Sequence, residues 1–96
     1  MNLRQLARGK ECQIRIPGVC NHDPETTVLA HWRGLGLSGI GKKAPDELAA
    51  WACSECHRFV DGQASAKASR EERRLALAEG IFRTQAKLLL MKRMDL

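Results

Sequence analysis

The sequence predicts a small α+β fold that ends in a long helix. The chain has 96 residues, which suits a single domain with a modest core. Thr26 to Trp32 is an apolar, β-branched run typical of a strand. From Ser69 onwards, apolar residues recur at helical spacing, and Ser69 with Glu72 forms the pattern of a capping box. We therefore expect one domain over residues 1–96, closed by a C-terminal helix over residues 69–94.

The other elements follow in chain order. Residues 3–8 favour a short helix, and Cys12 to Cys20 favours a looped knuckle. Residues 34–45 hold four glycines and a proline, which indicates a loop. Residues 48–52 are compatible with a strand or a helical turn, and the sequence does not decide between them. A helix is expected from Ser54 to Asp61, because the following glycine is the residue type that ends helices.

The C-terminal helix carries an apolar stripe on one face. Its members are Leu75, Ala78, Phe82, Ala86 and Leu89. Such a stripe can close the core or pair with a second subunit, so a homodimer through this helix stays open.

Composition limits the class of partner and the compartment. The formal net charge is +5, which is compatible with a polyanionic partner but does not require one. The N-terminus lacks the apolar core of a signal peptide, and no stretch approaches the roughly 20 apolar residues of a membrane span. We expect a cytoplasmic protein with no membrane contact.

Four cysteines form two pairs, and they carry the strongest chemical signal. Cys53 and Cys56 have the Cys-x-x-Cys spacing that places two thiolates at one tight turn, and Cys12 and Cys20 offer a second pair. In a reducing compartment this set favours a structural Zn²⁺ site over disulfides. A redox pair or inert thiols are the alternatives, although a redox pair does not need the two upstream cysteines.

His31 is the candidate catalytic residue. It lies on an apolar stretch between the two cysteine pairs, and Arg33 follows closely. A histidine on such a strand is often only a core residue with one hydrogen bond. In this setting, a neutral imidazole can instead take a proton from a water that attacks a phosphodiester.

His57 and Asp61 are the candidate ligands of a second ion. If a helix starts near Ser54, their spacing of four residues puts them on one helix face. An imidazole and a carboxylate can share a divalent ion such as Mg²⁺ or Mn²⁺ and leave positions open for water and phosphate. The alternatives are that His57 is a redundant fifth zinc ligand or a residue of the helix surface, and that Asp61 only pairs with Arg58 or ends the helix.

Lys42 and Lys43 end a glycine-rich segment that nearly matches a phosphate-binding loop. Lys43 stands where that motif has Ser or Thr, so the hydroxyl ligand for Mg²⁺ is missing. We therefore reject a nucleotide-binding loop. With Arg33, these lysines are predicted to hold a DNA backbone.

The order of these residues resembles the HNH or ββα-metal endonucleases. In that family a hairpin supplies a general-base histidine, a helix supplies metal ligands, and many members brace the hairpin with a four-cysteine zinc. The segments CQIRIPGVCN, TTVLAHWR and GLSGIGKKAPDELAAWACSECHRFVDG also resemble the small prophage-encoded YbcO-type proteins, across residues 10–62.

The resemblance implies a zinc-braced ββα-metal motif over residues 10–62 and cleavage of DNA in phage recombination or DNA processing. It assigns the structural zinc to the four cysteines, the general base to His31 and a catalytic ion to His57. A zinc-stabilised nucleic-acid-binding module without catalysis is the alternative.

Two positions depart from the family pattern. Ala30 stands where the family has an Asp or His ligand, and Asp61 is the candidate replacement. The family asparagine before the second cysteine pair is also missing. Asp46 or Glu47 is its nearest polar substitute.

Overall fold

The computed structural model describes residues 2–37, 43–64 and 67–94. The helices are α1 (Leu3–Ala7), α2 (Ser54–Val60) and α3 (Arg70–Met94), the strands are β1 (Val28–His31) and β2 (Ala49–Ala52), and two 3-10 turns are η1 (Pro24–Thr26) and η2 (Asp46–Leu48). The predicted small α+β class with a C-terminal helix is therefore confirmed. In the described part of the chain, no helix combines the length and apolar character needed to cross a bilayer.

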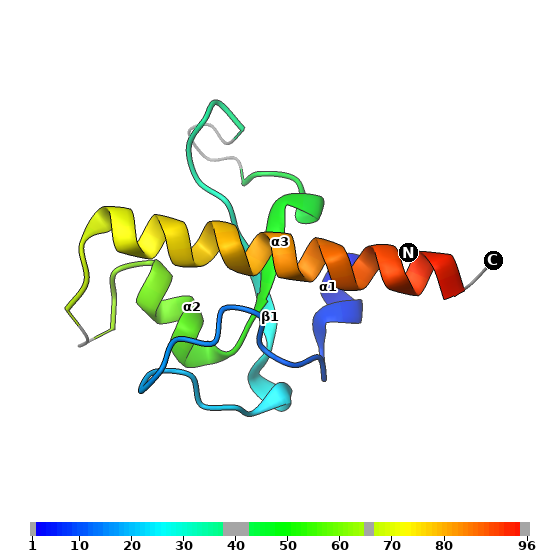
Figure 1. Cartoon of the computed structure of the whole chain (residues 1–96), viewed down its shortest axis with the longest axis horizontal. Helices are drawn as coiled ribbons and strands as arrows, with labels where there is room; N and C mark the ends of the chain where they lie inside the picture. The colour runs from blue at the N-terminus through cyan, green and yellow to red at the C-terminus, as the bar shows by residue number, and fades with distance from the viewer. Residues whose placement is uncertain (1, 38–42, 65–66, 95–96) are drawn as a thin grey trace.

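The two strands form an antiparallel hairpin, and the central part of α3 lies across it, with both ends of the helix extending beyond the strands (Figure 1). The undecided segment before Cys53 is thus a strand, with Ala30 opposite Ala50 and His31 opposite Ala49. All four residues of β2 are buried, and three of them are alanines. Small side chains on β2 let the helix backbone approach the sheet closely.

Helix α3 covers the outer edge of β2. Thr84 Oγ1 accepts a hydrogen bond from Trp51 N at 2.9 Å and donates one to Gly80 O at 2.8 Å. Arg83 Nε donates to Gln13 O at 2.6 Å, so the same helix also holds the segment next to Cys12. The outer edge of β2 is therefore satisfied at Trp51 N by the Thr84 hydroxyl and at Trp51 O by the backbone N–H of Gln13, 2.7 Å away, instead of by a third strand.

The buried face of α3 is not the predicted stripe. Leu77 and Ile81 are each 7% exposed and belong to the core cluster, whereas Leu75 and Phe82 are 61% and 71% exposed. The stripe therefore does not close the core. The core face includes Gly80 and Thr84, which are not apolar side chains and so do not contribute to a pattern of apolar residues. The pattern therefore predicted the opposite face of the helix as the buried one.

Gly80 gives a stability prediction. A Cβ at this position would lie 2.7 Å from Ile14 Cγ1 and 3.2 Å from Ala50 Cβ. Gly80→Ala should raise the free energy of unfolding by about 1 kcal/mol through helix propensity and lower it by about 1–3 kcal/mol through overpacking. Denaturant unfolding measures the net change. In an Ile14→Ala background the penalty should shrink, because the closest contact is gone and only the 3.2 Å contact with Ala50 Cβ remains. A Gly80→Ala penalty of equal size in both backgrounds would contradict the steric explanation.

Candidate metal centre and active site

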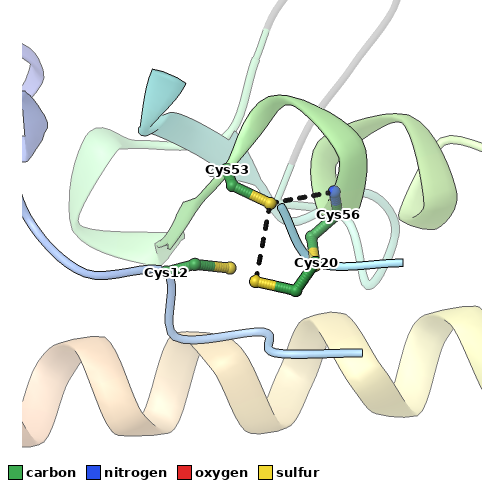
Figure 2. Close-up of side chains that lie close together, drawn as sticks. All are labelled: Cys12, Cys20, Cys53 and Cys56. Carbon is green, nitrogen blue, oxygen red and sulfur yellow. Dashed lines mark hydrogen bonds between the residues drawn. The ribbon is translucent and has the colours of Figure 1, made fainter. Parts of the chain in front are cut away.

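The four cysteines converge on one point beside the hairpin (Figure 2). All four Sγ atoms lie within 4.8 Å of one another, and the Sγ atoms of Cys20 and Cys53 are 3.8 Å apart. A tetrahedral Zn²⁺ with bonds of about 2.3 Å has sulfur–sulfur separations of about 3.8 Å. All four thiols are free, and three of them are buried. The set can therefore hold one metal ion, as the sequence predicted.

Local backbone geometry places each cysteine. Cys53 is the N-cap of α2, and its Sγ accepts from Cys56 N at 3.3 Å, so the Cys-x-x-Cys pair forms the first turn of the helix. A helix N-terminus favours a thiolate there. In the upstream loop, Arg15 N donates to Cys12 Sγ at 3.5 Å, with Arg15 at a φ of 55°. Gly18 turns the chain back to Cys20 at a φ of 77°.

The electrostatics of the four thiols suit a cation. A hydrogen bond from the Cys56 thiol lowers the pKa of Cys12 to about 4, and the same bond raises the pKa of Cys56. Burial, followed by the negative charge at Cys12, raises the pKa of Cys20 to about 11. Without a cation, a thiolate at Cys12 therefore keeps its neighbours protonated. A bound divalent ion removes the repulsion between neighbouring thiolates, since its positive charge stabilises several of them at once.

His31 makes a close contact with a carboxylate. Its Nε2 lies 2.7 Å from Asp46 Oδ1, and its side chain is 12% exposed. Asp46 comes from η2, fifteen residues along the chain, and Arg4 Nε of α1 lies 3.6 Å from the same oxygen. The hydrogen bond from His31, with Arg4 nearby, lowers the pKa of Asp46. The residue named as a substitute for the family asparagine is thus the partner of His31.

His57 and Asp61 share one face of α2, as their spacing predicted. His57 Nε2 lies 3.4 Å from Asp61 Oδ2, while Arg33 Nη2 lies 3.6 Å from Asp61 Oδ1. Asp61 therefore contacts both the candidate ligand and an arginine at the end of β1. One carboxylate oxygen faces each partner, and the arginine that contacts Asp61 is Arg33 instead of the neighbouring Arg58 that the sequence suggested.

The structure does not gather all candidate residues into one cluster. Among the residues it describes, the only group of three or more potential His, Cys, Asp or Glu ligands is the cysteine set. His57 and Asp61 are therefore a two-ligand pair. Lys43 is exposed, and Lys42 lies outside the described residues. His22, in the turn after Cys20, is exposed with its Nδ1 3.7 Å from Cys20 Sγ.

Comparison with known proteins identifies the family. A family model described as "Putative nuclease YbcO" matches residues 1–93. The chain belongs to the YbcO family. Curated YbcO relatives from Escherichia coli K12 and Enterobacteria phage 82, each named "Putative nuclease", are 52% identical over 84 residues, which is 88% of this chain and 86% of theirs.

A solved structure shares the fold of this YbcO chain. It is titled "Structure of a putative bacteriophage protein from Escherichia coli str. K-12 substr. MG1655" and is 40% identical. The match covers 97% of this chain and all of that one, with a TM-score of 0.72.

Sequence reasoning overlooked three arginines in this YbcO protein. Arg70, Arg73 and Arg74, in the first turns of α3, line a cavity that also contains Arg33 and Asp61. A signal was present in the sequence, because three arginines within five residues at a helix N-terminus oppose the helix dipole.

Proposed function

We propose that this protein is a metal-dependent endonuclease that hydrolyses DNA phosphodiester bonds, in phage recombination or DNA processing. The contact between His31 and Asp46 carries the proposal. A half-buried histidine held by a carboxylate at one ring nitrogen is the arrangement that orients a general base. The names of the YbcO relatives support the same class of activity.

The contact fixes the form of the imidazole. Because the pKa of Asp46 is lowered, this carboxylate is ionised near neutral pH and can only accept a hydrogen bond. His31 Nε2 therefore carries the proton that it donates to Asp46, which leaves the lone pair on Nδ1. In the proposed reaction, Nδ1 accepts a proton from the water that attacks phosphorus, and Asp46 stabilises the resulting imidazolium.

His57 and Asp61 are the residues that would hold the catalytic divalent ion. Asp61 Oδ2 and His57 Nε2 are close enough to serve as neighbouring ligands, and Oδ1 stays with Arg33. A Mg²⁺ ion commonly has few protein ligands and keeps several waters or phosphate oxygens. Such an ion supplies charge stabilisation for the pentavalent phosphate and the leaving oxygen.

Arg33, Lys42 and Lys43 are proposed to hold the DNA backbone. Arg33 is the best placed for this role, because its side chain is 76% exposed and follows His31 by two residues. Contacts of this kind make binding depend strongly on salt and only weakly on sequence.

Nicking of supercoiled plasmid tests the proposed function. Zinc-loaded protein is expected to nick the plasmid only when Mg²⁺ or Mn²⁺ is added, and His31→Ala with equal zinc content is expected not to nick it. DNA binding without nicking by either protein would favour the alternative, a zinc-stabilised nucleic-acid-binding module.

A second copy of the chain is the proposed partner for the exposed face of α3. Leu75, Phe82 and Leu89 are spaced by seven residues and are 61%, 71% and 55% exposed. Exposed charges near this face are acidic in the first half of the helix (Glu71, Glu79) and basic near its end (Lys92). An antiparallel pair centred near Phe82 brings apolar residues together and opposite charges face to face.

Size measurement by light scattering tests this pairing. The wild type is expected to be a concentration-dependent dimer. Phe82→Glu should weaken the dimer by at least about 10-fold, because two like charges meet at the centre of the pair. Gln63→Glu adds the same charge at an exposed position outside α3 and should leave the dimer intact. A wild type that stays monomeric at high micromolar concentration would rule out the pairing.

A further inference from the structure

A cavity lined by arginines lies between the end of β1, the end of α2 and the first turns of α3. Its volume is about 210 Å³, and its charged lining residues are Arg33, Arg70, Arg73, Arg74 and Asp61. Four arginines and one aspartate thus line the same cavity, and Arg33 is in contact with the aspartate. We infer that this arginine cleft binds a phosphate of the DNA backbone. The inference adds Arg70, Arg73 and Arg74 to the DNA contacts named in the proposed function. It rests on that proposed function for the identity of the polyanion as DNA.

Arg74 is held in place before any ligand arrives. Its guanidinium lies 4.7 Å from the centre of the Trp32 ring, and its Nη1 donates to Arg33 O at 3.3 Å. A Cβ at Gly34 would lie only 3.2 Å from this nitrogen. Stacking and close backbone contact restrict the side chain, so little conformational entropy is lost when its remaining N–H groups bind an anion.

Arg73 and Arg70 provide charge without a protein partner. The guanidinium of Arg73 lies against Gly62, where any side chain would collide with it. Neither side chain forms an ion pair or hydrogen bond with another described residue. Both also lie in the first turn of a 25-residue helix, whose positive end repels cations. Glu71 and Glu72 in the same turn offset part of this repulsion, and a phosphate bound by the two arginines would offset more of it.

The lining of the cleft is complementary to an oxyanion. The indole N–H of Trp32, which also lines the cavity, is buried and has no acceptor among the described residues. The carboxylate of Asp61 is already in contact with Arg33 and His57. Guanidinium groups match phosphate oxygens with two parallel hydrogen bonds, so a phosphodiester is the favoured ligand. Arg33 follows His31 by two residues, so the cleft begins next to the strand that carries the proposed base.

Fluorescence anisotropy with a short labelled duplex tests the cleft. The assay uses zinc-loaded protein without added Mg²⁺ or Mn²⁺, so it reports binding independently of cleavage. Arg70→Gln/Arg73→Gln is expected to bind on the order of 10-fold more weakly and to lower the slope of log K against log salt by about 2. The control Arg8→Gln/Lys10→Gln removes the same charge from residues that do not line the cleft and should change both values much less.

The outcomes separate this inference from the proposed function. Equal losses in the two double variants, or no duplex binding by the wild type, would overturn the arginine cleft. A further outcome is that millimolar inorganic phosphate displaces the duplex from the wild type while Arg70→Gln/Arg73→Gln keeps the wild-type salt slope. That result would assign the cleft to a free phosphate compound and would also overturn the inference. The nuclease proposal is judged separately, by whether nicking is lost in His31→Ala.

Discussion

Replacement of Cys56 by serine is expected to unfold the protein. Cys56 is fully buried and is one of the four thiols that converge on the metal centre. A structural Zn²⁺ contributes on the order of 10 kcal/mol, which is comparable to the whole stability of a small domain. We expect the variant to lose its cooperative thermal transition in circular dichroism, and a strong chelator should have the same effect on the wild type.

A matched control separates ligand loss from burial of a hydroxyl group. Ala52→Ser puts a hydroxyl at another fully buried position of the same core cluster without removing a thiol. It is expected to cost about 1–3 kcal/mol and to keep the bound zinc. If Cys56→Ser were destabilised no more than Ala52→Ser, the cysteine set would have no structural role as a metal site.

Loss of His31 is expected to have the largest effect on activity. His31→Ala removes the proposed base and should lower the nicking rate by about 10²–10⁴-fold, with zinc content and melting temperature near those of the wild type. Asp46→Asn keeps the shape of the contact but removes the charge, and it should lower the rate by about 10²-fold. Single-turnover nicking at saturating protein measures both variants.

Glu47→Gln is the matched control for Asp46→Asn. Glu47 is the other acidic residue of η2, and its side chain is exposed. The control should nick like the wild type. Because the pKa of Asp46 is lowered, this carboxylate stays ionised between pH 7 and about pH 5, so Asp46 itself should cause no loss of nicking in that range. Full activity of both His31→Ala and Asp46→Asn would refute the proposed base.

Local patterns in this chain predicted local structure well. Ser69 and Glu72 form the expected reciprocal cap, with Glu72 N donating to Ser69 Oγ at 3.1 Å and Ser69 N donating to Glu72 Oε1 at 3.2 Å. Gly62 follows α2 with a φ of 77°, as a glycine past a helix end should. The convergence of the cysteines was also predictable, because few arrangements other than a metal site use two such pairs.

Features that depend on contacts between distant residues were not predictable. The core face of α3 is set by the fit of Gly80 against Ile14 and Ala50, and a glycine carries no apolar signal. Asp46 and Glu47 were both candidates to replace the family asparagine, and only the position of η2 shows that Asp46 is the one in contact with His31. The arginine cleft requires α2 and α3 to be placed next to each other, which periodicity within one helix does not reveal.

The way α3 covers β2 has a consequence for protein engineering. A segment that holds all four cysteines and the proposed base, such as residues 10–62, invites excision and grafting as a portable module. In this protein the hairpin relies on Thr84 to satisfy Trp51 N and on Arg83 to hold Gln13 O. An excised segment would present an open strand edge beside an apolar surface, the combination that leads chains to associate in solution. Transplantation of this motif therefore requires its C-terminal helix to move with it.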